Sequence, residues 1–201
     1  MNRIIAFDLG NVIFNFDYTI AFEKLKGFSR PRNMKPIEDF LCRNFSLDFE
    51  KGLLTPREFY KEFSREFLFR ASFEDFKQAW NSIFWVNHPV PVLLEKLSKT
   101  YPLYLISNIN ELHFENIRSK YPEIVNLFSG LVLSFRIKSI KPQKAIYASL
   151  RDVCQREYRE IIYIDDRLEL IEAAGRMGIV SLHFKDYASL VKDLKGIGVK
   201  I

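Results

Sequence analysis

Five short runs of apolar residues recur along the chain, and few polar residues interrupt them. Because both faces of each run are apolar, they are typical of strands in a sheet that helices cover on both sides. They occupy residues 3–8 (RIIAFD), 103–107 (LYLIS), 131–135 (LVLSF), 160–165 (EIIYID) and 179–184 (IVSLHF). Helical patterns lie between or after these runs, at residues 89–99, 110–120, 142–156, 167–176 and 186–195. The alternation predicts an α/β fold with a parallel sheet in a three-layer, Rossmann-like core.

Residues 18–88 break this alternation and contain no pattern that we interpret as a strand. They predict an all-helical segment with helices over residues 18–26, 34–45, 55–69 and 72–84. Phe59, Phe63 and Phe67 recur every four residues, which places them on one stripe of a helix and favours a helical core. The alternative is that some of these aromatic side chains line a pocket. We therefore expect a core domain of residues 1–17 and 89–201, with residues 18–88 inserted as a helical cap.

Composition narrows the class of protein. Apolar residues make up 48% of the 201 residues, and no run of 18 apolar residues occurs, so we expect no membrane span. The first ten residues lack the features of a signal peptide, which favours a cytoplasmic location. The net charge is +5, but basic and acidic residues are interleaved, as in RDVCQREYRE. This mixing argues against a nucleic-acid partner, and we expect a monomer.

Polar side chains follow four of the predicted elements at the point where ligands bind in parallel sheets, beyond the carboxyl ends of the strands. Taken singly, each has an ordinary explanation as a turn residue, a helix cap or a solvated charge. Their joint occurrence at matching strand ends predicts a functional site. The residues are Asp8, Ser107, Asn108, Lys141, Asp165 and Asp166.

These residue types suit the hydrolysis of a phosphate ester. Asp8 and Asp165 supply the hard oxygen ligands that Mg²⁺ prefers, and Gly10 lets a backbone carbonyl face the same ion. Gly10 and Asn11 bend the chain behind Asp8, so that backbone N–H groups form an anion-binding turn. We include Asn11 among the phosphate-binding residues for this reason. Asp8 is also the candidate nucleophile, through an aspartyl-phosphate.

The remaining residues complete a phosphate site. Ser107 and Asn108 can donate hydrogen bonds to phosphoryl oxygens, and Lys141 can neutralise their charge, which makes Lys141 a second catalytic candidate. The expected partner is a small phosphorylated metabolite.

Four motifs carry a resemblance to a known family. FDLGNV, LISN, IKP and IYIDD resemble, in order and spacing, the signature motifs of the haloacid dehalogenase superfamily, and the helical insert resembles its cap. The first motif is similar to that of the branch typified by alpha-D-glucose-1-phosphate phosphatase. The resemblance implies that Asp8 is the nucleophile and, with Asp165 and the Gly10 carbonyl, a Mg²⁺ ligand. It implies phosphate binding by Ser107, Asn108 and Lys141, and places Asp166 in the second shell of the metal.

The sequence departs from the superfamily at two positions. Phosphatases of this superfamily usually carry an Asp two residues after the nucleophile, as general acid and base, and here that position is Gly10. Asp17 either replaces this acid or serves as a helix N-cap or hinge. The second departure is Leu170, where an Asn is frequent.

Three functions remain open from the sequence. The first is a Mg²⁺-dependent phosphatase of a small phosphorylated metabolite, for which a sugar phosphate is one candidate. The second is a 2-haloacid dehalogenase, which shares the Asp nucleophile but needs no metal; the adjacent pair Asp165–Asp166 favours the phosphatase. The third is a phosphate-binding or regulatory protein of low turnover, which Gly10 and Leu170 suggest.

Overall fold

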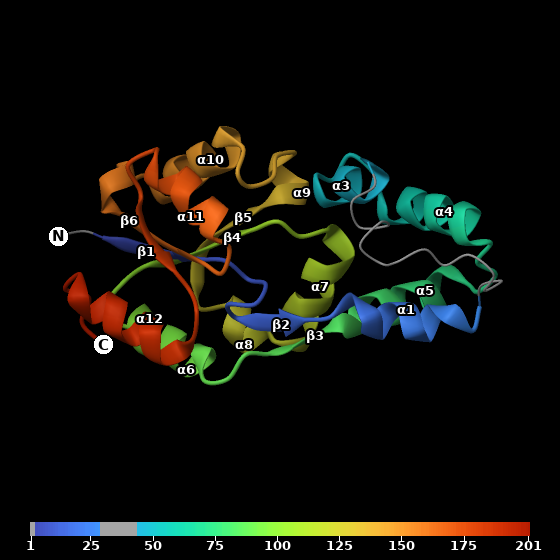
Figure 1. Cartoon of the computed structure of the whole chain (residues 1–201), viewed down its shortest axis with the longest axis horizontal. Coiled ribbons are helices and arrows are strands. Elements are labelled where there is room, and N and C mark those ends of the chain that lie inside the picture. The colour runs from blue at the N-terminus through green and yellow to red at the C-terminus, as the bar shows by residue number, and fades with distance from the viewer. Residues whose placement is uncertain (1–2, 29–43) are drawn as a thin grey trace.

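The computed structural model of the chain describes residues 3–28 and 44–201, and its centre is a five-stranded parallel sheet. The strand order is β5-β4-β1-β6-β7, with β1 in the middle (Figure 1). The strands are β1 (Ile4–Phe7), β4 (Leu103–Ser107), β5 (Phe128–Leu133), β6 (Ile161–Asp165) and β7 (Val180–His183). All five predicted strands are therefore present, and β5 begins three residues earlier than the pattern indicated. The first half of β5 includes Gly130, and because glycine is a poor strand former, the apolar pattern did not indicate this part of the strand.

Helices cover both faces of the sheet, because alternate strand residues point to opposite sides. In β1, Ile5 and Phe7 belong to one apolar cluster, while Ile4 and Ala6 belong to another. The first cluster contains residues of α6 (Val90–Ser98), α7 (Glu111–Lys120), α8 (Pro122–Val125) and α12 (Tyr187–Gly196). The second contains residues of α10 (Lys144–Cys154) and α11 (Leu168–Gly175). Figure 1 shows these two sets on opposite sides of the strands, which confirms the predicted three-layer α/β fold.

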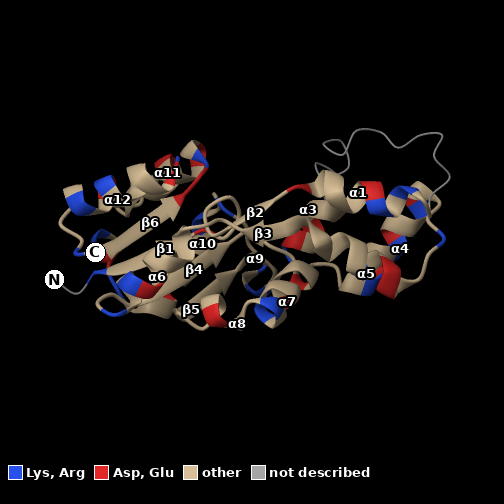
Figure 2. Ribbon diagram, turned by 90° about the horizontal axis from the view of Figure 1, so that it is seen from below, with Lys and Arg blue, Asp and Glu red and all other residues tan. Residues whose placement is uncertain are grey.

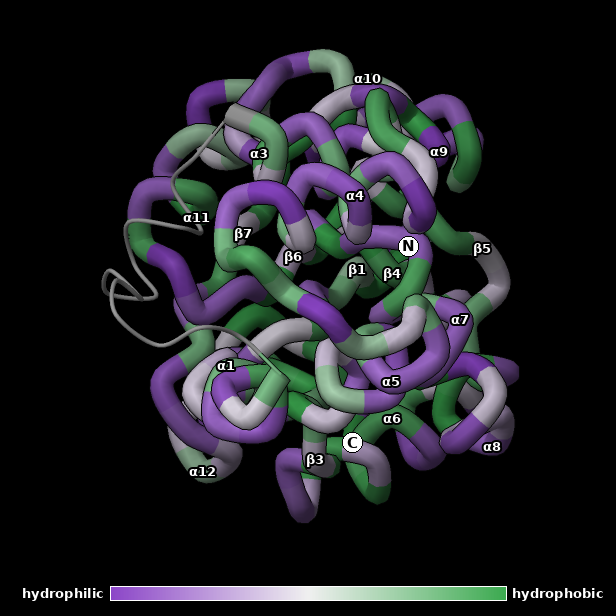
Figure 3. The backbone as a smooth tube through the Cα atoms, turned by 90° about the vertical axis from the view of Figure 1, so that its right-hand side faces the viewer, coloured by the Kyte–Doolittle hydropathy of each residue, from purple (hydrophilic) through white to green (hydrophobic). Residues whose placement is uncertain are grey.

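A helical segment extends from one end of the sheet (Figure 1). It contains α1 (Tyr18–Lys26), α3 (Asn44–Glu50), α4 (Pro56–Phe67) and α5 (Phe73–Trp80). Figure 3 looks onto this end and shows α3 beside α4 and α1 beside α5. The stripe of Phe59, Phe63 and Phe67 is buried in the cluster between these helices, so its interpretation as a helical core is confirmed. Most of the predicted helix over residues 34–45 lies outside the described residues.

Two short strands were not predicted. β2 (Phe14–Phe16) and β3 (Phe84–Val86) form an antiparallel pair in which Phe14 lies opposite Val86. The expectation of no strand in residues 18–88 is wrong at this point, because β3 begins at Phe84. Each run is only three residues long and is stabilised by a partner about seventy positions away, which local periodicity does not reveal. The pair joins the helical segment to the sheet.

The remaining elements are short turns of helix. They are η2 (Asn81–Ile83), α9 (Ser134–Ile137) and η3 (Tyr158–Glu160). Among the described residues, no helix has the length and apolar character needed to cross a membrane. Basic and acidic residues are mixed along the outer helices (Figure 2), as their interleaving in the sequence predicts.

Candidate active site

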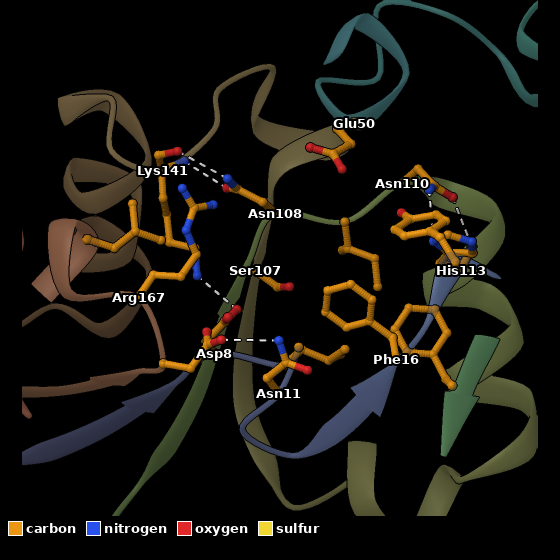
Figure 4. Close-up of a pocket in the computed structure, with 17 residues that line it drawn as sticks. Asp8, Asn11, Phe16, Glu50, Ser107, Asn108, Asn110, His113, Lys141 and Arg167 are labelled. Carbon is orange, nitrogen blue, oxygen red and sulfur yellow. Dashed lines mark hydrogen bonds and ion pairs between the residues drawn. The ribbon is translucent and has the colours of Figure 1, made fainter. Parts of the chain in front are cut away.

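The predicted site residues meet at the carboxyl edge of the sheet, around a cavity of about 160 Å³. Asp8 follows β1 directly, and its backbone N–H donates to the Ile164 carbonyl at 2.8 Å. The pairing of β1 with β6 therefore continues as far as Asp8. Ser107 ends β4 and Asp165 ends β6, while Lys141 comes from the loop before α10. Figure 4 shows the side chains of Asp8, Ser107 and Lys141 around one space. The parallel topology therefore brings together groups that are far apart in the sequence.

Three carboxylates form a cluster at this edge. Asp8, Asp165 and Asp166 each offer a carboxylate oxygen within 4.8 Å of the others. Asp8 and Asp165 are thus close enough to bind one ion together, which the sequence interpretation required. Oxygen donors of this kind suit a hard divalent cation. Asp166, predicted in the second shell, is close enough to be a direct ligand as well.

Lys141 lies between two of these carboxylates. Its Nζ is 2.8 Å from Asp8 Oδ1 and 2.7 Å from Asp165 Oδ2, and it donates to the Ile106 carbonyl at 3.2 Å. These three bonds use every proton of the ammonium group. Its side chain is only 1% exposed. Burial lowers the pKa of Lys141, but the two carboxylates more than offset this, so the net shift is upward. The lysine therefore stays charged.

The Asp8 carboxyl has an unusual pKa. Burial raises the pKa of Asp8 to about 7; the Lys141 charge opposes this rise, and the charge of Asp165 adds to it. Asp165 also accepts hydrogen bonds from the Tyr163 hydroxyl and from the backbone N–H of Arg167, the latter at 2.9 Å. Two buried acids share one ammonium group, so the ionised cluster keeps a net negative charge. A divalent cation at this place would relieve that charge, and the residues fit such an ion.

Asn108 holds the backbone of Lys141 from both sides. Its Oδ1 accepts from the Lys141 backbone N–H at 2.7 Å, and its Nδ2 donates to the Lys141 carbonyl at 3.1 Å. The side-chain amide that we predicted for phosphate binding is therefore engaged in positioning Lys141. Ser107 lines the cavity and is 2% exposed.

Asn11 closes the turn behind Asp8. Its φ of 54° lies in the left-handed region, which Asn tolerates better than most residues. Its backbone N–H donates to the Phe14 carbonyl at 2.7 Å, and its Nδ2 donates to Asp166 Oδ2 at 3.1 Å. The side chain thus orients a member of the acid cluster, and it also lines the cavity.

Comparisons with known proteins agree with this geometry. No protein-family model matches the chain. The sesquiterpene phosphatase astK of Aspergillus oryzae is 24% identical over 192 residues, covering 94% of this chain and 93% of that protein. The HAD family enzyme BT-2542 of Bacteroides thetaiotaomicron, in a complex with magnesium and inorganic phosphate, superposes with a TM-score of 0.84 at 27% identity. The match covers 94% of this chain and 99% of that one.

A further likeness concerns the fold. The predicted HAD-like hydrolase of Porphyromonas gingivalis has a TM-score of 0.80 at 21% identity, over 97% of this chain and 98% of that one. The chain is a member of the haloacid dehalogenase (HAD) superfamily. It is therefore a hydrolase of that superfamily, as its four motifs predicted.

The structure leaves little space for a side chain at position 10. A Cβ atom added at Gly10 would lie 2.8 Å from Cε1 of Phe16, closer than real side chains approach. The ring of Phe16 lines the cavity (Figure 4). An Asp at position 10 would need Phe16 to move. Leu170, the second position at which the sequence departs from the superfamily motifs, is buried at the cavity wall.

Asp17 does not line the cavity. Its Oδ1 accepts from the Thr19 backbone N–H at 2.8 Å, and this contact caps the first turn of α1. The hydrogen bonds to Thr19 also lower the pKa of Asp17. Of the alternatives open from the sequence, the structure shows the helix N-cap.

His113 is a buried neutral group at the cavity wall. Its Nε2 donates to the Trp80 carbonyl at 3.1 Å, and its Nδ1 accepts from the Asn110 side chain at 2.9 Å. Its ring stacks on that of Trp80 with centroids 5.4 Å apart. Burial lowers the pKa of His113 to about 3, and the bond to Trp80 opposes this only in part.

We expect His113 to make the protein acid-sensitive. The pKa is lower in the folded state than the ordinary 6.5, so the unfolded chain binds the proton first and stability falls as the pH drops from about 6.5 toward 3. Between pH 7 and pH 5, the wild type should lose about 2 kcal/mol more than His113→Gln. Urea unfolding at these pH values measures the difference. Equal losses in both proteins would contradict the assignment.

One acidic residue at the cavity escaped the sequence analysis. Glu50, the last residue of α3, lines the cavity from the helical segment. No local motif marks it, because its place depends on how α3 packs against α9, which is distant in sequence.

Proposed function

We propose that this HAD hydrolase is a Mg²⁺-dependent phosphatase of a small phosphorylated metabolite, and that it acts through an aspartyl-phosphate at Asp8. The observation that supports this most directly is the cluster of Asp8, Asp165 and Asp166 within 4.8 Å, with Lys141 between two of them. Carboxylates that hold a cation, next to an ammonium group, are the arrangement that phosphoryl transfer needs, because its catalysis is mostly electrostatic.

Mg²⁺ would bind to the carboxylates of Asp8 and Asp165 and to the carbonyl of Gly10, with Asp166 as a ligand or as a hydrogen-bond partner of bound water. When bound, the ion supplies positive charge to the phosphoryl oxygens. The Bacteroides enzyme, which is similar over almost the whole chain, has been solved with magnesium and phosphate. The net negative charge of the buried acids supports the same ion here.

Several side chains would each have a separate role in the first chemical step. An oxygen of Asp8 attacks phosphorus, the bond from phosphorus to the leaving oxygen breaks, and its electron pair passes to that oxygen. Lys141, through its charge, and the Ser107 hydroxyl stabilise the phosphoryl charge. Asn108 contributes by fixing Lys141. Water then cleaves the aspartyl-phosphate and returns free Asp8.

The cavity favours a small substrate. Its wall above the acids carries the aromatic side chains of Phe16, Tyr18 and Phe84, together with the carboxylate of Glu50. An aromatic face and hydrogen-bonding groups suit the ring of a sugar, so a sugar phosphate is the finer proposal. The similar protein from Aspergillus is named a sesquiterpene phosphatase. A panel of test substrates should therefore include prenyl phosphates as well as sugar phosphates.

The metal requirement gives a direct test. We expect phosphate release from p-nitrophenyl phosphate to stop in EDTA and to return when excess Mg²⁺ is added, because Asp8 and Asp165 repel a phosphate without the cation. A 2-haloacid should release no chloride. The two other functions predict different results: chloride release that is insensitive to EDTA identifies a dehalogenase, and phosphate binding without turnover identifies a regulatory protein.

A further inference from the structure

A phosphatase must deliver a proton to the leaving oxygen, and the residues that line the cavity leave few donors. Asp8 and Asp166 belong to the acid cluster. Both ring nitrogens of His113 have hydrogen-bond partners, and its pKa of about 3 keeps it neutral. Burial and the charge of Glu50 raise the pKa of Tyr18 beyond the useful range. Among the described carboxyl groups at this cavity, Glu50 is the one outside the acid cluster.

The carboxylate of Glu50 is directed into the cavity. Figure 4 shows it on the wall formed by the helical segment, across the space from Asp8. Among the described residues, its carboxylate has no hydrogen-bond or ion-pair partner, although Arg167 lies near enough to act on it through its charge. Burial raises the pKa of Glu50, and Arg167 opposes the rise. A half-buried acid without a partner is expected to carry a proton more readily than an exposed one.

Contacts with the core hold Glu50 in place. The Ser134 hydroxyl, at the start of α9, lies 2.6 Å from the Glu50 carbonyl oxygen. At Gly52 the chain has a φ of 63°, and a Cβ there would lie 2.2 Å from the Phe135 carbonyl oxygen, so the two backbones are in direct contact. Lys138 donates to the Gly52 carbonyl. The turn that follows α3 is thus fixed on the core, and the position of Glu50 with it.

The position across from Asp8 also suits the reaction. In phosphoryl transfer the attacking and leaving oxygens lie roughly in line, so a leaving oxygen faces away from Asp8 and toward the helical segment. Gly10, beside Phe16, offers no acid from the other side.

We propose that Glu50 is the general acid and base of this enzyme, in place of an acid at position 10. This inference rests on the proposed phosphatase function. In the first step the leaving oxygen receives the electron pair of the broken bond and the proton of Glu50, which becomes a carboxylate. In the second step Glu50 takes a proton from the water that attacks phosphorus. The bond from phosphorus to Asp8 breaks, its electron pair returns to Asp8, and phosphate leaves.

Two aryl phosphates with different leaving groups test this assignment. p-Nitrophenolate leaves without a proton, whereas the phenolate of phenyl phosphate needs one. In Glu50→Gln, kcat/KM for phenyl phosphate should fall by about 10²–10⁴-fold, and for p-nitrophenyl phosphate by about tenfold or less. The kcat should fall with both substrates, because the same aspartyl-phosphate must be hydrolysed. Glu50→Asp should recover part of the loss with phenyl phosphate.

Asp17→Asn is the matched control, because it makes the same change at a carboxylate that only caps a helix, and Asn caps as well as Asp. It should keep the wild-type ratio of the two substrates. Equal losses of kcat/KM in Glu50→Gln, or no loss at all, would overturn the proposal for Glu50. Failure of the wild type to hydrolyse either ester would instead overturn the phosphatase function. Retained phosphate affinity and unfolding midpoint show that Glu50→Gln is folded.

Discussion

Replacing Asp8 by Asn is expected to lower phosphatase turnover by about 10⁴-fold or more, because an amide oxygen does not attack phosphorus as a carboxylate does. The fold should be kept. Asn has the shape of Asp, its Oδ1 can still accept from Lys141, and burial already raises the pKa of Asp8 to about 7. The change in unfolding free energy should therefore be within about 1 kcal/mol. Initial rates with p-nitrophenyl phosphate and Mg²⁺, together with urea unfolding, measure both quantities.

Asp17→Asn provides the control for that experiment, since its carboxylate lies outside the cavity. It should show wild-type turnover. If Asp8→Asn hydrolyses the ester at a rate comparable to the wild type, Asp8 is not the nucleophile, and the role given to the acid cluster fails with it.

Replacing Lys141 by Met should be the most destabilising single change at the site. It leaves Asp8 and Asp165 buried and facing each other without their shared ammonium group. Removing one partner of a buried ion pair typically costs about 3–5 kcal/mol. Turnover should also fall by about 10²-fold or more, because the phosphoryl group loses the positive charge beside it. Urea unfolding and steady-state rates are the measurements.

The stability of the Lys141→Met protein should also depend on Mg²⁺. In EDTA the Lys141→Met protein should show its full loss of stability, whereas Mg²⁺ should restore part of it by replacing the missing positive charge. Lys144→Met, at an exposed lysine on the neighbouring helix, should change neither stability nor rate by more than a small amount. A Lys141→Met protein as stable in EDTA as the wild type would show that the buried acids do not repel each other as we infer.

The strand ends of this protein could be predicted because two physical rules act over short stretches of sequence. Apolar runs without alternation indicate strands covered on both faces, and parallel strands gather their carboxyl ends at one edge. These rules bring Asp8, Ser107 and Asp165 together without knowledge of any contact. The two rules do not predict that the Asn108 side chain bonds the backbone of Lys141, since that contact depends on side-chain rotamers in two loops.

The features that escaped prediction depend on pairing between distant segments. β2 and β3 are too short to show a period, and they exist because Phe14 and Val86 meet in the folded chain. Glu50 ends a helix that contacts the core through Ser134, which lies 84 positions further along the chain. The close approach of Gly10 and Phe16 likewise follows from the turn at Asn11, not from any motif.

The pairing of β2 with β3 bears on how such enzymes diversify. Since Phe14 lies opposite Val86, the chain enters the helical segment and returns from it at two neighbouring positions. A different segment joined at these two adjacent points would leave the strand order of the five-stranded sheet unchanged. Recombination that exchanges this one segment would thus replace the side of the cavity that carries Glu50 and leave the carboxyl edge of the sheet in place.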